Sequence, residues 1–301
     1  MSDGGRPSEE RVLGKATGSN SRPNPGRNHE KTPAASAPLA PAPTPRAPAI
    51  SAPAISAHRG GEETTCPGTF EAYQRAVAAG AEYVEFDVRR TSDGQLVAYH
   101  HARTPSARAI SAVSYRRLCR LSGYDVPLVT DVMRLLAGRA TGHIDLKEAR
   151  DAASVLGHAQ KILGTAGFVA TTRDDALAAE LRRRFPGARL ALTIGGDLAG
   201  TARLALRQAR THGLSRLDRV LACQVSWAAV HHRLAAAGML RECRLRGIKT
   251  IVWTVNDDLA LVRWLSHPEV DVLVTDRPAR AAALRARLAP ALGRVQAVSA
   301  R

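Results

Sequence analysis

Short apolar runs of strand character alternate with helical stretches from residue 54 to residue 288. Brief runs rich in β-branched residues are typical of buried strands, whereas longer stretches with apolar positions three and four apart are typical of helices. The barrel strands are predicted over residues 54–58, 83–88, 143–147, 167–171, 189–194, 219–224, 250–255 and 270–275. Intervening helices are predicted, for example, over residues 69–80, 175–185 and 258–266. Eight strand–helix units in about 230 residues predict an α/β fold, the (β/α)8 TIM barrel.

Two features bear on this assignment. The structural alternative is an open doubly wound sheet, but the first strand is followed by H-R-G-G-E-E and not by a G-x-G-x-x-G fingerprint. Residues 1–53 carry 10 of the chain's 17 prolines and have no period that could bury a face, which predicts a disordered Pro/Ala-rich tail. We therefore divide the chain into this tail, a barrel over residues 54–288 and a C-terminal extension over residues 289–301.

One further strand, over residues 95–100, does not fit the barrel count. It follows the second barrel strand after only T-S-D-G, and a parallel crossover needs about a dozen residues or more. It must therefore return as a hairpin strand, with Asp93-Gly94 as the predicted two-residue turn. That register places His100 opposite Asp87, and a four-residue loop would place it opposite Glu85.

Candidate metal ligands lie on two of the predicted strands. Glu85 and Asp87 are two residues apart, and so are Asp145 and Lys147, so each pair shares a strand face. The carboxyl ends of parallel barrel strands converge on one mouth. Three carboxylates without an arginine between them suit a hard divalent cation, Mg²⁺ or Ca²⁺. Taken singly, such an Asp is more often a helix cap and a D-x-K pair more often a salt bridge, and their agreement on one mouth favours the metal site.

Two histidines are expected at the same mouth, His58 at the end of the first strand and His100 on the hairpin. Histidines on different strands can act as acid and base across a scissile bond. Arg59 and Lys147 would neutralise a bound phosphodiester. His231 and His232 are predicted to be surface residues of a helix, and Cys66 to be structural.

The net charge of +16 indicates attraction to anionic partners or simply an arginine-rich surface. Only 4% of residues are aromatic and no basic stretch is interleaved with stacking residues, so we expect no nucleic-acid partner. Four dispersed cysteines without a C-x-x-C pair suit a reducing compartment. The sequence has no run of 18 apolar residues that would predict a membrane span, and it has no recognisable signal peptide. A cytoplasmic location is therefore expected.

The motifs together resemble the glycerophosphodiester phosphodiesterase family. They are H-R-G, then E-x-D with a histidine thirteen residues after that aspartate, then H-I-D-L-K, W-T-V-N and T-D-R-P, spread over about residues 55–278. The resemblance implies a (β/α)8 barrel that uses one divalent cation to cleave glycerophosphodiesters to glycerol 3-phosphate and an alcohol. It also implies a route in which a glycerol hydroxyl attacks phosphorus and water then opens the cyclic phosphate.

Carried over position by position, the resemblance implies a role for each matching residue. The acid/base pair is His58 and His100; the metal ligands are Glu85, Asp87 and Asp145; and Arg59, Lys147 and Trp253 contact phosphate, the metal's surroundings and the alcohol. Three positions depart from the family pattern. Residues 66–69 are C-P-G-T where the family usually has P-E-N-T, His101 replaces the Asp of an H-D pair, and Asp145 stands where Glu is usual. Glu62 or Glu63 is a candidate to replace the lost polar role.

Three classes of function stay open on this basis. The first is a phosphodiesterase acting on glycerophosphodiesters or, as in a related phospholipase D family, on lysophospholipids. The second is a non-catalytic barrel that binds a phosphorylated ligand, motivated by the two missing motifs. The third is binding to nucleic acid or a membrane surface through the arginine-rich surface and residues 277–301. The oligomeric state is not predicted.

Overall fold

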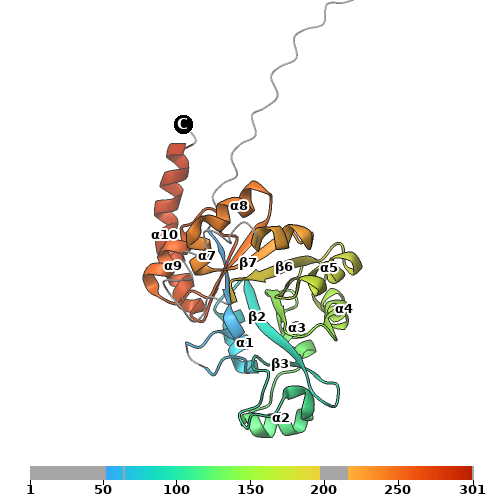
Figure 1. Ribbon diagram of the computed structural model, residues 1–301. Coiled ribbons are helices and arrows are strands. Elements are labelled where there is room, and N and C mark those ends of the chain that lie inside the picture. The colour runs from blue at the N-terminus through green and yellow to red at the C-terminus, as the bar shows by residue number, and fades with distance from the viewer. Residues whose placement is uncertain (1–51, 64, 197–215, 300–301) are drawn as a thin grey trace, which may run out of the picture. The chain divides into compact units, whose positions relative to one another are not determined.

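Eight parallel strands close into a barrel, and β1 pairs with both β2 and β9 to complete the ring (Figure 1). The computed structural model describes residues 52–63, 65–196 and 216–299, with side chains as far as residue 289, all within the compact unit Pro48–Arg301. The barrel strands are β1 (Ala54–Ala57), β2 (Tyr83–Arg90), β4 (Thr141–Leu146), β5 (Phe168–Thr172), β6 (Arg189–Ile194), β7 (Trp227–His231), β8 (Lys249–Trp253) and β9 (Val272–Thr275). The predicted fold class is confirmed.

Helices surround the barrel, and several begin at a side-chain cap. Thr69 Oγ1 accepts from the amide of Ala72 at 3.2 Å, and Asp174 and Asp257 cap their helices in the same way. The helices that lie wholly within the described residues are α1 (Phe70–Ala78), α2 (Tyr115–Ser122), α3 (Val129–Leu136), α4 (Ala152–Leu163), α5 (Asp175–Arg184), α7 (His232–Leu234), α8 (Leu240–Leu245), α9 (Asp258–Leu265) and α10 (Pro278–Ser299). Short 3₁₀ or π turns cover His58–Gly60, Ile110–Ala112 and Ala235–Met239.

The two faces of the barrel strands bury different kinds of residue. Outward-facing side chains such as Phe86, Ile144 and Leu192 pack under the helices in the larger core. Inward-facing side chains such as Val169 and Ile251 fill the barrel interior in a second cluster. Because side chains alternate along a strand, the polar residues at the strand ends are the top layer of that inward face.

The predicted strand over residues 219–224 is wrong, because residues 216–222 are helical and the sixth barrel strand is β7. Its apolar run has helical spacing, since Leu217, Val220 and Cys223 are buried while Leu221 is 43% exposed. A short apolar run does not distinguish strand from helix without that burial pattern. The correction moves His231 to the end of a barrel strand, where it is buried, so its prediction as a surface helix residue is also wrong.

The predicted hairpin strand exists as β3 (Leu96–Ala98), antiparallel to β2, but its register differs from both alternatives. Val88 pairs with Ala98, so the loop has three residues. The Thr91 amide donates to the Gln95 carbonyl at 3.0 Å, and Gly94 takes a left-handed φ of 84°. This register aligns Tyr99, and not His100, with Asp87.

The described residues cover the two predicted domain boundaries to different extents. The predicted tail lies outside the described residues except for Ala52 and Pro53. The boundary between residues 288 and 289 falls inside α10, which continues to Ser299. Within the described ranges, none of the helices combines the length and hydrophobicity that a bilayer span requires.

The hairpin loop generates a stability prediction. Gly94→Ala should lower the free energy of unfolding by about 1 kcal/mol, because a residue with a Cβ is strained at positive φ. Gly157→Ala is the matched control, because its site inside α4 has no atom within 4 Å of the added Cβ, and we expect stabilisation of about 0.5–1 kcal/mol. Urea unfolding midpoints measure both. Equal shifts of the same sign would contradict the assigned loop conformation.

Candidate functional site

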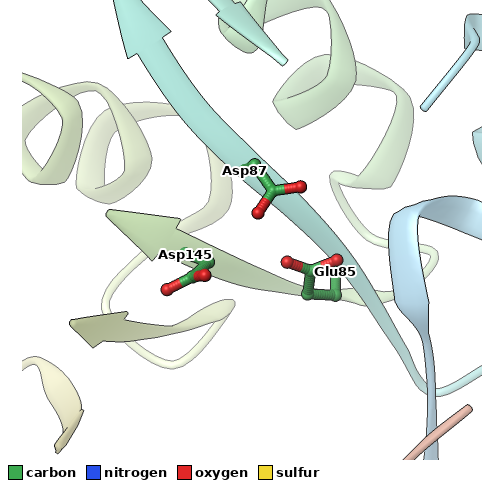
Figure 2. Close-up of side chains that lie close together, drawn as sticks. All are labelled: Glu85, Asp87 and Asp145. Carbon is green, nitrogen blue, oxygen red and sulfur yellow. The ribbon is translucent and has the colours of Figure 1, made fainter. Parts of the chain in front are cut away.

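Three carboxylates from neighbouring strands point toward one another at the barrel mouth (Figure 2). Glu85 and Asp87 come from β2 and Asp145 from β4, and each offers an oxygen within 4.8 Å of the others. The Cα atoms of Asp87 and Asp145 are register partners, so the parallel ladder itself brings the two strands' acids together. The structure confirms the predicted clustering of these three acids at the barrel mouth.

Lys147 offsets part of this negative charge. Its Nζ lies 2.7 Å from Asp87 Oδ1 and also forms an ion pair with Asp145. Burial lowers the pKa of Lys147, but the neighbouring carboxylates more than reverse this, so its pKa is raised. Burial raises the pKa of Asp87, but the hydrogen bond from His100 and the charge of Lys147 outweigh burial, so the net pKa of Asp87 lies below its usual range. Lys147 is thus a fixed cation of the site.

The repulsion among the three carboxylates is compensated least at Glu85. Burial, and then the charges of Asp87 and Asp145, raise its pKa well above the ordinary value. It accepts one hydrogen bond from the Arg59 amide, at 2.9 Å. Two buried acids and the half-buried Asp145 face one lysine and leave an excess of negative charge that a bound cation would offset. The donor set is all oxygen, and the residues therefore fit a hard divalent cation such as Mg²⁺ or Ca²⁺.

His58 is held by an aspartate that the sequence analysis did not select. Its Nδ1 lies 2.5 Å from Asp276 Oδ1, just beyond the end of β9. Asn256 binds the same carboxylate through its side-chain amide and accepts the Asp276 amide proton at 2.9 Å. Burial raises the pKa of Asp276, and the bond to His58 and the bond from Asn256 reverse this to a net lowering. Asp276 lies in the quoted T-D-R-P motif, and its position at a strand end is the signal that could have selected it.

His100 reaches the carboxylate cluster although it lies beyond the hairpin ladder. In a continued ladder it would face away from Asp87, because a one-residue shift reverses the side-chain face. β3 ends at Ala98, however, and the chain then turns, with Arg89 Nε donating to the His100 carbonyl at 3.1 Å. His100 Nδ1 thereby lies 3.1 Å from Asp87 Oδ2. The predicted proximity to the acidic pair is correct although both predicted registers are wrong.

The two histidine rings face the same space. Their centroids are 6.5 Å apart and their planes are nearly perpendicular. Each ring binds an aspartate through Nδ1, His58 with Asp276 and His100 with Asp87, which leaves both Nε2 atoms for other contacts. A carboxylate bound to one ring nitrogen fixes the orientation of a histidine. This arrangement is suited to moving protons on opposite sides of a group placed between the rings.

Arg59, Trp253 and Lys147 occupy different parts of the site. Lys147 and Trp253 line a cavity of about 170 Å³ together with both histidines. The Arg59 backbone is left-handed, with φ of 51°, and its Nε is buried without a hydrogen-bond partner among the described residues. Trp253 Nε1 is also buried without such a partner, and its ring meets His231 edge-on at 5.0 Å. Unpaired buried donors mark positions where a bound ligand can supply the acceptor.

The departures from the family pattern have structural consequences. Thr69, the last residue of C-P-G-T, caps α1. The carboxylate of Glu63 accepts the amides of Ala279 and Arg280, both at 2.9 Å, and is therefore engaged at the start of α10. His101 packs edge-on against His100, with centroids 5.1 Å apart. Asp145, the shorter acid, accepts from Thr171 Oγ1 at 2.9 Å.

His143 lies one layer below Asp145 inside the barrel. Its Nδ1 is 3.1 Å from Ser56 Oγ, and it lines the cavity floor. Burial lowers the pKa of His143 to about 4; the nearby Asp145 and Asp87 raise it, and His58 and Lys147 lower it further. The sequence analysis did not select this residue, although its position two residues before Asp145 places it on the same strand face.

Comparison with known proteins places these residues in a family context. The model of the glycerophosphoryl diester phosphodiesterase family matches residues 58–171, which include both histidines and all three clustered acids. The chain is 26% identical over 251 residues to glycerophosphodiester phosphodiesterase GDPD4 of Arabidopsis thaliana, covering 74% of this chain and 70% of that protein.

Solved structures share the fold. A glycerophosphodiester phosphodiesterase from Thermotoga maritima superposes with a TM-score of 0.63 at 24% identity, covering 77% of this chain and 98% of that one. An Oleispira antarctica phosphodiesterase, solved in complex with the product sn-glycerol-3-phosphate, superposes with a TM-score of 0.61 at 14% identity, covering 77% and 96%. At these identities the likeness establishes the barrel.

His143 generates a prediction on pH-dependent stability. Its folded pKa lies below its unfolded value, so between pH 6.5 and 4 the unfolded chain binds a proton that the folded chain does not, and stability falls as pH falls. From pH 7 to pH 5 this costs about 2 kcal/mol. His143→Gln should therefore lose about that much less stability over the interval, measured by urea unfolding in EDTA. His158→Gln on α4 is the control for removing a histidine elsewhere. Equal pH-dependent losses in wild type and His143→Gln would contradict the prediction.

Proposed function

Because the chain belongs to the glycerophosphoryl diester phosphodiesterase family, whose members are phosphoric diester hydrolases, we propose that it cleaves glycerophosphodiesters to glycerol 3-phosphate and an alcohol. The observation that carries this proposal is the placement of two aspartate-bound histidines beside three clustered carboxylates at one barrel mouth. The product bound to the Oleispira antarctica phosphodiesterase has the chemistry expected of such a reaction.

The acidic cluster is the proposed binding site for one divalent cation, Mg²⁺ or Ca²⁺. Glu85, Asp87 and Asp145 would hold it through carboxylate oxygens. When bound, such a cation polarises a phosphoryl oxygen and stabilises charge that develops in the transition state. Charge balance supports the assignment, since Lys147 is the only lysine or arginine paired with these acids among the described residues.

His58 and His100 are proposed as the acid/base pair. With Nδ1 engaged by Asp276 or Asp87, each ring presents Nε2 to a phosphodiester between them. As the glycerol hydroxyl forms its bond to phosphorus and the P–O bond to the alcohol breaks, one Nε2 accepts the hydroxyl proton and the other donates a proton to the leaving alcohol oxygen. Water then opens the cyclic phosphate to glycerol 3-phosphate, with the roles of the two rings reversed. Both rings line the same cavity, which supports this division of roles.

Three further residues are proposed to bind the substrate. Arg59 would donate to a phosphate oxygen, which its buried and unpaired Nε supports. Lys147, fixed between Asp87 and Asp145, would neutralise charge on the phosphoryl group. Trp253 would form a wall of the alcohol pocket, consistent with its place in the cavity lining.

Release of glycerol 3-phosphate from glycerophosphoinositol tests the proposal. Purified protein should release it with Mg²⁺ or Ca²⁺ and stop in chelator, because the carboxylates would lose the cation. His58→Ala and His100→Ala should each lower kcat by about 10²–10⁴-fold, since general acid–base catalysis contributes that much.

The controls separate chemistry from folding. His158→Ala removes a histidine of α4, outside the site, and should keep the wild-type rate. Circular dichroism should show the same secondary structure in all three variants. Release that continues in chelator, or full rate in either active-site variant, would contradict the assigned roles.

A further inference from the structure

Arg173 is an unassigned cation at the same mouth. It follows β5 directly and lines both the catalytic cavity and an adjoining polar groove of about 440 Å³. Cavity and groove share His100, Asp145 and Lys147 as well. A substrate held between the histidines therefore has a path along which its alcohol portion meets Arg173.

The guanidinium of Arg173 is held in place by two neighbours. Its Cζ lies over the Trp253 ring, 5.7 Å from the centroid. It also lies against Gly196, where an added Cβ would approach Cζ to 2.8 Å and Nη1 to 2.9 Å. Only glycine at position 196 permits this close approach. The guanidinium position therefore depends on two contacts, one with the Trp253 indole and one with the backbone of Gly196.

The charge of Arg173 is available to a ligand, unlike that of the other basic side chains lining the groove. Arg89 pairs with Glu148 at 2.9 Å, and Lys147 pairs with Asp87 and Asp145. The neighbouring Asp174 accepts the Leu177 amide as the cap of α5. No ion pair of the described residues involves Arg173.

This arrangement has opposite consequences for cationic and anionic alcohols. An open indole face attracts quaternary ammonium groups. Here that face carries a guanidinium, which repels a second cation and attracts an anion. A guanidinium also donates two parallel hydrogen bonds to a phosphate or carboxylate.

We propose that Arg173 is a specificity residue for glycerophosphodiesters whose alcohol carries a second anionic group, a phosphate monoester or a carboxylate. The inference rests on the proposed phosphodiesterase function and names the substrate class of that same site. It places the enzyme's preference away from glycerophosphocholine and glycerophosphoethanolamine, whose alcohols are cationic.

Two matched substrate pairs test the preference. Glycerophosphoinositol and glycerophosphoinositol 4-phosphate differ by one phosphate, and glycerophosphoethanolamine and glycerophosphoserine differ by one carboxylate. The expected kcat/KM is about tenfold higher for the anionic member of at least one pair, and the pair that responds identifies the anion. The preference should shrink as salt rises, because exposed charges are screened.

Variants assign the effect to Arg173. Arg173→Gln should remove the tenfold preference, chiefly by raising KM for the anionic member of the pair. Gly196→Ala should reduce the preference by displacing the guanidinium while keeping its charge. Arg183→Gln removes the same charge at the far end of α5 and should leave the preference intact.

The outcomes separate the two levels of the proposal. Turnover of glycerophosphoinositol with kcat/KM ratios near one in both pairs, or ratios unchanged in Arg173→Gln, would overturn the role of Arg173 and leave the phosphodiesterase function standing. No turnover of any of the four compounds with either metal would overturn the proposed function, and the inference with it.

Discussion

Electrostatic repulsion among Glu85, Asp87 and Asp145 is the constraint on which the rest of the site depends. Parallel strands in register bring these carboxylates within 4.8 Å of one another, in surroundings that exclude most water. Burial of like charges is costly unless other groups compensate. The chain answers with Lys147, with the Arg59 amide and with His100, and the raised pKa of Glu85 shows that this compensation is incomplete. A divalent cation is the ligand that such an arrangement favours.

The same constraint organises the catalytic histidines proposed here. Asp87 holds His100 and Lys147 through different oxygens, so the acidic cluster and the acid/base pair share a residue. His58 has its own aspartate, Asp276, just beyond the end of the neighbouring strand β9, and Asn256 holds that carboxylate in place. Each histidine is therefore oriented by an acid supplied by a different part of the barrel, and Arg173 adds a held cation where the alcohol would leave.

The sequence was sufficient for those features that follow from a two-residue period. Glu85, Asp87 and Asp145 were predicted on one mouth because strand faces alternate and parallel strands end together. The hairpin register could not be predicted in this way. The sequence T-S-D-G is compatible both with a two-residue turn and with the three-residue loop, in which Gly94 has a positive φ. The sixth barrel strand was misplaced because Val220 and Cys223 belong to a buried helix face that a six-residue apolar run does not reveal. The bond of Asp276 to His58 and the contact of Arg173 with Trp253 join residues far apart in the sequence, and local patterns do not encode such contacts.

Direct calorimetric titration of Mg²⁺ and Ca²⁺ into metal-free protein is the sharpest test of the central claim that the three carboxylates hold a cation. The account predicts one site per chain for at least one of the two ions. It also predicts that Glu85→Gln weakens binding strongly, while the protein gains stability from the loss of a repelling charge. Failure of both ions to bind, or binding that is unchanged in Glu85→Gln, would contradict the account.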